Sequence, residues 1–466
     1  MADRITRFDF EGYCVHYNAS NGRFASTPYL HELQLNEYFE MIDFTAPPRE
    51  LDFFPKIVIS VNLTIDCNLR CLYCFNHEKR NHTTSLQNTF SFIKKIVQNS
   101  PKAQRFFVDF TGSGEPLLML PHILSVANYC KQLSDEFRKE ITVMLATNGL
   151  LLNKRTVDVL RENSILFGIS LDGYRENHDK FRLDLLGRPT FDRIVRNISQ
   201  IDDMSFIGAA MTVASDDTDI FKSYSFLAQH FETISIRFAR MDYSSFSFSL
   251  ALNGYSQVSS LIIEEARRDS IDFISRIING EDFFGKQLVK YIASAFMNRR
   301  CDAGLGRYSL SPDGNVYICA PAIFDTRGVL SLAESDFIDC HDANINALHS
   351  NARAHCKECL LLSFCGGRCI VDNQNSLSDR AFCDFQKAVF RIVLRTMGFI
   401  QMTCPGLYLS LQNLVTDIIM RNYADASISE VLQSDGNSLT FTQLKSIKDK
   451  NPEAFRRIHD AISSDF

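Results

Sequence analysis

Three cysteines stand close together in the stretch TIDCNLRCLYCFN, residues 64–76, at positions 67, 71 and 74. A structural zinc ion takes four protein ligands, so three cysteines leave one position of a metal centre open. Thiolates also ligate iron–sulfur clusters, whose type is read from the cysteine spacing. The spacing Cys67-x3-Cys71-x2-Cys74 therefore predicts a metal centre whose open position binds a substrate or a cofactor.

A second group of seven cysteines lies between residues 301 and 383. Its spacing includes two residues between Cys356 and Cys359, a separation that suits zinc as well as iron–sulfur clusters. On spacing alone, both kinds of metal remain open. Cys14, Cys130, Cys340 and Cys404 stand alone, and we expect them to be inert thiols. The members of the second group are Cys301, Cys319, Cys356, Cys359, Cys365, Cys369 and Cys383.

Composition narrows the class of protein. The chain has 466 residues, too many for one ordinary core, which predicts two or three domains. A net charge of −6 gives no reason to expect nucleic acid or an anionic membrane as partner. The N-terminus lacks a signal-peptide pattern and no long apolar run is present, so we expect a cytoplasmic protein. Reduced thiols in that compartment favour metal ligation over disulfides for the 14 cysteines.

Strand and helix signals alternate from residue 56 to about residue 240. This alternation predicts a parallel sheet with helices outside, curled into a full or partial barrel. Strands are expected over 57–65, 105–111, 141–147, 166–171, 206–213 and 233–239, and helices over 85–98, 119–137, 153–163, 188–201, 217–230 and 256–277.

Polar residues alternate with apolar ones along these strands. A filled eight-stranded barrel packs apolar side chains inside, so the polar face favours an open barrel of six strands with a wet lumen. The alternative is an antiparallel sheet with one solvated face. Charged groups in a lumen are costly unless they pair with a ligand or with each other. We therefore predict that Asp109, Asp172 and Arg237 act in catalysis, close to a bound substrate.

The flanking segments differ from the barrel. The stretches RFDFEGYCVHY and GRFAS around NASNG predict a β-hairpin followed by a short helix, either capping the barrel or offering a strand edge to a peptide. SPDGNVYIC at 311–319 predicts a second hairpin. The expected organisation is an N-terminal hairpin and helix at 1–55, the barrel at 56–280, a cysteine-rich domain at 281–385 and a helical extension at 386–466.

With Tyr73 before its third cysteine, the cysteine triad resembles the signature of the radical S-adenosylmethionine (SAM) superfamily, from about residue 56 to 280. The resemblance implies a [4Fe–4S] cluster on Cys67, Cys71 and Cys74, with SAM on the open iron. In this family, SAM is cleaved to a 5′-deoxyadenosyl radical that removes a hydrogen atom from an unactivated C–H bond. A low-potential donor such as flavodoxin or ferredoxin would supply the electron.

Short motifs at successive strand ends extend the resemblance. TGSGEPLL at 111–118 resembles the segment that binds the SAM amino group, which implies this role for Gly114 and Glu115; Ser113 replaces the usual glycine. ATNG at 146–149 offers Asn148. SLDG at 170–173 and HDKFR at 178–182 imply ribose and carboxylate contacts by Ser170 and Arg182.

The second cysteine group resembles the SPASM domain of radical SAM enzymes that modify peptides and proteins. The resemblance implies two auxiliary [4Fe–4S] clusters, which makes three clusters in all. The inner one lacks a fourth cysteine: either Cys340 completes it, or its fourth site is open or filled by another group, which we favour. The implied ligands are Cys356, Cys359, Cys365 and Cys383 for one cluster and Cys301, Cys319 and Cys369 for the inner one.

Three functions compete. The chain could mature a ribosomally made precursor peptide by an oxidative change, foremost an intramolecular cross-link. It could mature sulfatases by oxidising Cys or Ser to formylglycine, or it could be an electron-transfer protein. The SAM-binding motifs disfavour the third. Sulfatase-maturing relatives typically place an aspartate, the catalytic base, directly after the second SPASM cysteine, whereas Ala320 follows Cys319 here, which favours peptide maturation.

Overall fold

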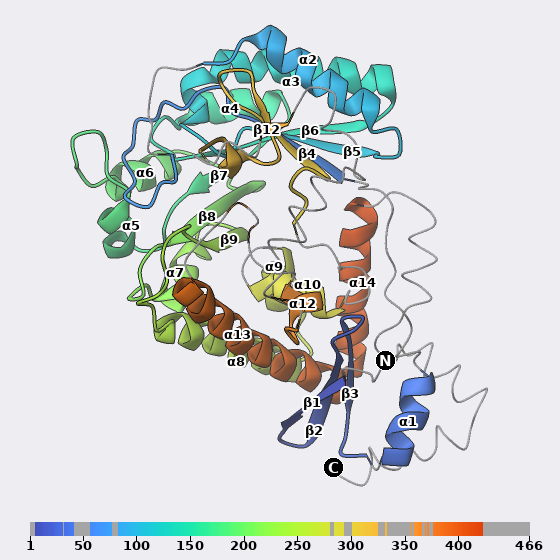
Figure 1. Ribbon diagram of the computed structural model, residues 1–466. Coiled ribbons are helices and arrows are strands. Elements are labelled where there is room, and N and C mark those ends of the chain that lie inside the picture. Colours follow the sequence, from blue (N-terminus) through green and yellow to red (C-terminus); the bar gives the residue numbers. More distant parts are fainter. Residues whose placement is uncertain are drawn as a thin grey trace.

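A curved sheet with six successive parallel strands forms the main body of the protein (Figure 1). The computed structural model describes residues 5–30, 32–41, 56–76, 83–279, 284–292, 301–324, 331–332, 356, 358–365, 369, 371 and 376–422. The six strands are β4 (Lys56–Val61), β5 (Arg105–Asp109), β6 (Glu140–Thr147), β7 (Ile165–Ser170), β8 (Ile207–Val213) and β9 (Thr233–Phe238).

All five pairings between these strands are parallel and follow chain order. The predicted parallel sheet is thus confirmed, and the antiparallel alternative is wrong. Residues 57–65 are buried throughout, on both faces of the strand. Strands of parallel sheets are commonly covered on both faces. Within the described residues the sheet ends at β9 without closing on itself, so the barrel is partial.

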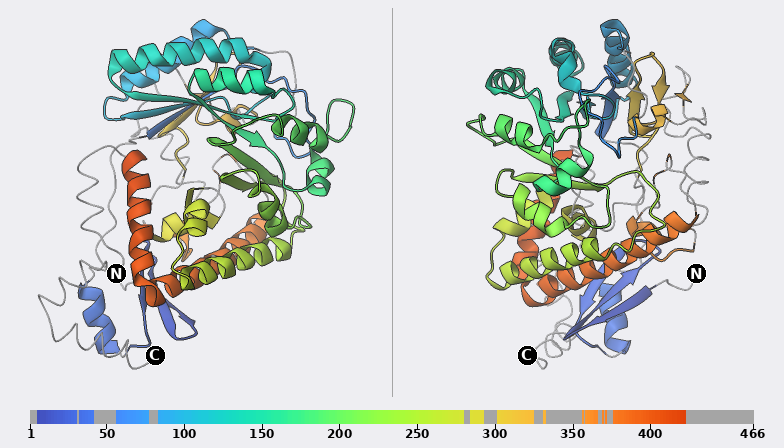
Figure 2. Two further views of the ribbon diagram at one scale, coloured as in Figure 1. Left: turned by 180° about the vertical axis from the view of Figure 1, so that it is seen from behind. Right: turned by 90° about the vertical axis from the view of Figure 1, so that its left-hand side faces the viewer.

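Helices between the strands cover the outer face of the sheet (Figure 2). α2 and α3 pack on each other, and Asn153 and Asp219 cap the N-termini of α4 and α7 through side-chain oxygens. The helices are α2 (Leu86–Asn99), α3 (Leu120–Phe137) after the 3-10 turn η1 (Pro116–Met119), α4 (Lys154–Glu162), α5 (Arg175–Phe181), α6 (Phe191–Ile198), α7 (Ile220–Leu227), α8 (Ser249–Arg267) and α9 (Asp272–Asn279).

Two helix predictions are corrected. The single helix expected over 256–277 is two helices, because the chain turns at Asp269, whose φ is +55°, between α8 and α9. The helix α5 was not predicted, since its sequence, RENHDKF, has no apolar period.

The predicted second hairpin is confirmed and extends the barrel sheet. β10 (Arg307–Leu310) pairs antiparallel with β11 (Val316–Tyr317), which pairs with β12 (Ser331–Leu332). β10 also pairs parallel with β4, a long-range pairing that the sequence analysis did not predict. The 3-10 turn η3 (Ala320–Phe324) follows directly after Cys319.

The N-terminal segment is a three-stranded sheet rather than a two-stranded hairpin. A turn at Glu11–Gly12 divides the expected first strand into β1 (Ile5–Phe10) and β2 (Tyr13–Asn18), and β3 (Arg23–Thr27) and α1 (Glu32–Met41) follow. The sheet packs on the C-terminal helix α13 (Ser376–Thr403), away from β4–β6, so it does not cap the barrel (Figure 1). The Tyr13 hydroxyl donates to the carbonyl of Arg395 at 2.6 Å.

Helix α13 also corrects an expected domain boundary. It is continuous through residues 385 and 386, so the expected boundary falls inside a helix that packs along α8. α10 (Phe284–Ile292), α12 (Leu362–Cys365) and α14 (Pro405–Asn422) complete the described helices. None of the helices in the described ranges is long and apolar enough to cross a membrane.

The contact between the N-terminal sheet and α13 depends on a glycine. A Cβ atom at Gly398 would lie 2.7 Å from side-chain atoms of both Tyr13 and Val15. Gly398→Leu should therefore overpack this contact and lower the free energy of unfolding by about 1–3 kcal/mol, measured by urea denaturation. Gly406→Leu is the matched control, because a Cβ there meets nothing within 4 Å. Equal stability of the two variants would contradict the close packing.

Candidate active site

The cysteine triad lies in the loop after β4, at the carboxyl end of the strand. Cys71 lies close enough to Cys67 and Cys74 for their charges to act on it, and burial raises the pKa of the Cys71 thiol. Cys67 Sγ accepts hydrogen bonds from the Leu69 amide at 3.4 Å and the Asn148 side chain at 3.8 Å. Donors of this kind stabilise a thiolate, the form that ligates metals.

The segment after α5 holds the cysteine loop in place. The amide of Arg70 donates to the carbonyl of Leu183 at 2.8 Å, and the amide of Leu72 donates to the carbonyl of Phe181 at 3.0 Å. Leu69 forms an antiparallel bridge with Asp184. The loop conformation is therefore fixed by backbone pairing with residues more than 100 positions later in the chain.

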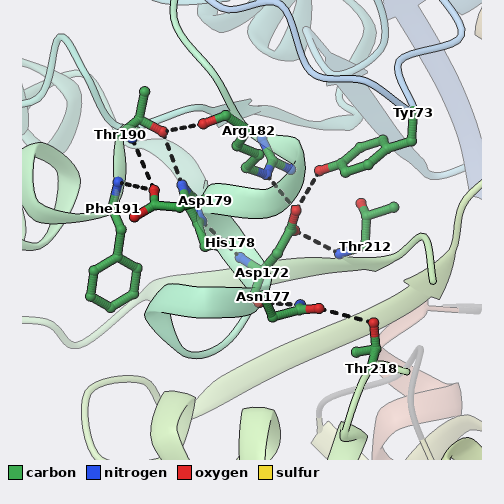
Figure 3. A network of polar contacts seen from close by, with 10 residues as sticks. All are labelled: Tyr73, Asp172, Asn177, His178, Asp179, Arg182, Thr190, Phe191, Thr212 and Thr218. Carbon is green, nitrogen blue, oxygen red and sulfur yellow. Dashed lines mark hydrogen bonds and ion pairs between the residues drawn. The ribbon is translucent and has the colours of Figure 1, made fainter. Parts of the chain in front are cut away.

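A buried carboxylate, Asp172, connects this segment to the cysteine loop (Figure 3). Its Oδ2 accepts from the Tyr73 hydroxyl at 2.6 Å and from Arg182 Nε at 2.9 Å, and its Oδ1 accepts from the Thr212 amide at 2.9 Å. Asp172 is fully buried, and the Arg182 side chain is 9% exposed. Burial opposes the Arg182 charge, but the neighbouring Asp172 raises the pKa of the guanidinium nonetheless.

This network changes the interpretation of Asp172. We predicted a lumenal group near the substrate, but its carboxylate is occupied by a tyrosine, an arginine and a backbone amide of the protein itself. Its place in the structure indicates that it orients Tyr73 and Arg182. Arg182 still suits the implied SAM contact, because its Nη atoms have no hydrogen-bond partner among the described residues.

His178 forms hydrogen bonds with the backbone and side chains that surround Asp172. Its Nδ1 accepts from the Asp172 amide at 3.2 Å, so the ring proton is on Nε2, which lies 3.0 Å from Thr190 Oγ1. The Thr190 hydroxyl donates to the carbonyl of Arg182 at 2.7 Å. Burial lowers the pKa of His178 to about 3, which is consistent with a neutral ring.

The residues of the TGSGEP stretch lie against the cysteine loop. A Cβ atom at Gly114, whose φ is +69°, would lie 2.5 Å from the carbonyl oxygens of Thr64 and Asp66, so only glycine fits. The buried Glu115 carboxylate accepts from the Leu117 amide at 3.1 Å, the Thr147 hydroxyl at 2.7 Å and the Asn148 amide at 2.8 Å. Glu115 therefore joins two strand ends, whatever contact it makes with SAM.

The other two side chains implied in SAM binding differ in whether they already form hydrogen bonds within the protein. The Asn148 side chain donates to Asn68 Oδ1 at 2.6 Å and accepts from the Leu150 amide at 3.0 Å. The hydroxyl of Ser170, at the end of β7, makes no hydrogen bond to the described residues and is partly exposed. Ser170 thus remains available to a ligand, whereas Asn148 is already engaged.

Asp109 ends β5, and Arg237 lies exposed on β9. Burial raises the pKa of Asp109, and Arg307 and Arg237 act on its charge from β10 and β9. Arg307 donates through Nε to Asp302 at 3.0 Å and also interacts with Cys319. The sequence pattern did not reveal Arg307, because its position depends on the unpredicted pairing of β10 with β4.

Two other residues were missed for a related reason. The Ser113 hydroxyl donates to Asn62 Oδ1 at 2.7 Å, and Asn62 Nδ2 donates to Ser309 Oγ at 2.8 Å. This buried chain ties the TGSGEP loop to β4 and β10. The substitution of Ser113 for glycine was the one sequence signal that pointed to it.

Some cysteines of the second group lie close enough for their charges to act on a common neighbour. Cys319 interacts electrostatically with Cys369 and Cys301, and burial raises its pKa to about 12. Lys387 on α13 interacts with both Cys359 and Cys383. Cys356 is buried and Cys365 half-buried beside them in sequence. Cys340 lies outside the described residues. In the described ranges, no three His, Cys, Asp or Glu side chains form a single-ion site.

Known proteins resemble this chain in sequence and in fold. Residues 61–218 match the Radical SAM superfamily. The chain is 26% identical over 366 residues to a cysteine-type anaerobic sulfatase-maturating enzyme of Clostridium novyi, covering 72% of this chain and 95% of that enzyme. It is 31% identical over 159 residues to a serine-type anaerobic sulfatase-maturating enzyme of Bacteroides thetaiotaomicron. That match covers 32% of this chain and 37% of that enzyme. The solved structure "Native anSMEcpe with bound AdoMet and Cp18Cys peptide" superposes on this chain with a TM-score of 0.57 at 21% sequence identity. The superposition covers 78% of this chain and 100% of that one.

Residues 61–218 therefore form a radical SAM domain, as the motifs predicted. A domain of this class implies one [4Fe–4S] cluster and SAM. The residues fit them: three cysteine thiols lie in one short loop, and the Arg182 Nη atoms and the Ser170 hydroxyl have no hydrogen-bond partner among the described residues. The parallel sheet is of the type found in the solved sulfatase-maturating structure.

The buried pair at the site should be costly to break. Asp172→Asn leaves the Arg182 charge without its carboxylate, and we expect a loss of about 3–5 kcal/mol in the free energy of unfolding by urea. Asp192→Asn, which breaks the exposed pair with Arg175, should cost less than about 1 kcal/mol. A small loss for both would show that Asp172 does not organise the site.

The buried His178 predicts a pH dependence of stability. Its pKa is about 3 in the folded protein and about 6.5 when unfolded, so acid protonates the unfolded chain first and favours unfolding. This residue should account for about 2 kcal/mol of lost stability between about pH 7 and pH 5. His178→Gln should make the urea-unfolding free energy less pH-dependent, whereas the surface variant His230→Gln should match the wild type.

Proposed function

We propose that the chain is a radical SAM maturase that oxidises a side chain of a peptide or protein substrate. The bound cluster and SAM would supply a 5′-deoxyadenosyl radical, which takes a hydrogen atom from the substrate. Cys67, Cys71 and Cys74 would hold the cluster, and Arg182, Ser170 and the Gly114–Glu115 backbone would bind SAM.

One contact supports a more specific proposal than a radical SAM domain alone. A Cβ atom at Gly112, in the TGSGEP loop, would lie 3.0 Å from Ala320 Cβ, so the residue after Cys319 touches the proposed SAM loop. The Cys301, Cys319 and Cys369 group thus adjoins the radical site. We propose that this group and the Cys356, Cys359, Cys365 and Cys383 group hold auxiliary [4Fe–4S] clusters. The inner one would accept the electron that leaves the substrate radical.

The lumen beside these cysteines would receive the substrate. Arg237 and Arg307 both act on the charge of Asp109 there, and Asp109 Oδ1 accepts from the amide of its neighbour Thr111 at 2.8 Å. A carboxylate whose pKa is raised by burial could take up a proton or bind a polar side chain in this position. A precursor peptide is the proposed partner, supported by the peptide in the similar solved structure.

A cross-link or a related oxidative change is our first candidate for the product. Ala320 cannot accept a proton, and formylglycine formation needs a base for the substrate thiol or hydroxyl. Sulfatase maturation is the second candidate, because sulfatase-maturating enzymes are the relatives that cover most of the chain. In that case Asp109 would have to serve as the base instead.

Product analysis separates these candidates. The reconstituted enzyme, reduced with dithionite, should release 5′-deoxyadenosine and convert a precursor peptide from its own gene neighbourhood to a product lacking two hydrogens. A cross-linked product should not react with a hydrazide probe, whereas formylglycine should. Cys71→Ala should abolish both signals, and Cys404→Ala should leave them unchanged. Conversion of a sulfatase peptide alone, to a hydrazide-reactive product, would replace the first candidate by the second.

A further inference from the structure

Arg307 lies between the carboxylate of Asp109 and the thiol of Cys319. In the hairpin of β10 and β11, Ser309 stands opposite Tyr317. Continuing this antiparallel register by two residues places Arg307 opposite Cys319, and the side chains of opposite residues project to the same face of a sheet. The charge of Arg307 acts on Cys319, as this position requires. The arginine therefore adjoins a proposed ligand of the inner cluster.

The register of the barrel sheet places Asp109 on the same face as Arg307. Ser60 on β4 pairs with Ser309 on β10 and with Asp109 on β5. Residues paired across neighbouring strands project to one face of a sheet, and so do residues two positions apart in a strand, such as Arg307 and Ser309. Asp109 and Arg307 are two strands apart, about 10 Å at the usual strand spacing. Across this separation, the charges of the two side chains act on each other.

The protein leaves hydrogen-bonding capacity unused at both charges. Arg307 donates through Nε to Asp302 at 3.0 Å, and its Nη groups donate to none of the described residues. Asp109 accepts from Thr111 and from no other residue in the described ranges. The Arg307 side chain is 34% exposed and Asp109 is half-buried, so a ligand can reach both. Arg237 on β9 is a further charged group that acts on Asp109.

We propose that Asp109 accepts the proton and the inner cluster accepts the electron that the substrate radical releases, and that Arg307 couples the two transfers. The inference rests on the proposed function. After the hydrogen atom is taken, a neighbouring N–H, O–H or C–H group of the substrate bonds to the radical carbon. The bond to hydrogen in that group breaks, and its proton passes to Asp109. One electron passes to the oxidised [4Fe–4S] cluster proposed on Cys301, Cys319 and Cys369, which becomes reduced.

Electrostatics supplies the coupling. Reduction adds a negative charge beside Arg307, and protonation removes one from Asp109, so after both events the guanidinium charge stabilises the cluster alone. Each transfer therefore makes the other more favourable, and this linkage is reciprocal. The site is partly buried, where charges are screened less than in water. Burial also raises the pKa of Asp109, which suits a proton acceptor. In this scheme Asp109 touches the substrate and is a catalytic residue, whereas Arg307 is a positioning residue.

The test is a redox titration of the reconstituted enzyme without substrate, followed by electron paramagnetic resonance. The inner cluster is identified as the signal that Cys369→Ala lacks. In the wild type its midpoint potential should fall as the pH rises, by up to about 59 mV per pH unit, which corresponds to one tenfold change for one electron. Asp109→Asn should remove this pH dependence. Arg307→Gln should lower the midpoint and flatten the slope, and Arg307→Lys, which keeps the charge, should restore both.

The controls are Arg105→Gln, which breaks the pair with Glu140 at the opposite end of β5, and the surface variant Asp192→Asn. Both should match the wild type in midpoint and slope. In turnover with dithionite, Asp109→Asn should release 5′-deoxyadenosine within about twofold of the wild type but form at least about tenfold less product, because the proton has no acceptor.

A wild-type midpoint that does not vary with pH would overturn the proposal, as would an unchanged slope in Asp109→Asn. Equal midpoints of the wild type and Arg307→Gln would overturn the role of Arg307. An iron content of about four per chain would also overturn the proposal, since the inner cluster would be missing. Absence of 5′-deoxyadenosine from the wild type would defeat the proposed function, whereas the titration would still decide the coupling.

Discussion

The ion pair between Asp172 and Arg182 is the interaction on which the site depends. Both side chains are buried, so each charge requires the other, and the pair draws in the Tyr73 hydroxyl and the Thr212 amide. Tyr73 belongs to the cysteine loop, Thr212 to β8, and Arg182 to the segment after α5. One carboxylate thereby fixes three parts of the chain around the proposed open iron. The arrangement orients Arg182 without occupying its Nη atoms.

A second set of buried polar groups joins the two cysteine groups. Ser113, Asn62 and Ser309 form a hydrogen-bonded chain from the TGSGEP loop to β10, and the hairpin that begins with β10 leads to Cys319. Unpaired polar groups at this depth would each cost free energy, so the chain specifies how the hairpin docks on the barrel. The proposed electron transfer between substrate and inner cluster requires such a fixed relation between the two groups.

The cysteine loop is held by contacts on both sides of its cysteines. The Tyr73 hydroxyl donates to Asp172 at 2.6 Å. The amides of Arg70 and Leu72 donate to the carbonyls of Leu183 and Phe181. The conformation of the loop therefore depends on residues far from it in the sequence, which a cysteine spacing alone does not reveal.

The sequence alone determined the parallel order of the six strands, the place of the triad and the candidate ligands, because periodicity and cysteine spacing are local properties of the chain. Asp109 and Arg237 were assigned to the lumen from strand phase; this assignment stays a prediction, although the Arg237 charge acts on Asp109. Tertiary structure alone decided the pairing of β10 with β4, and with it the positions of Arg307 and Ala320. It also decided that Asp172 pairs with Arg182 and that the N-terminal sheet packs on α13. These depend on contacts between residues far apart in the chain, whose free energy comes from burial and charge pairing in the folded protein and leaves no periodic trace in the sequence.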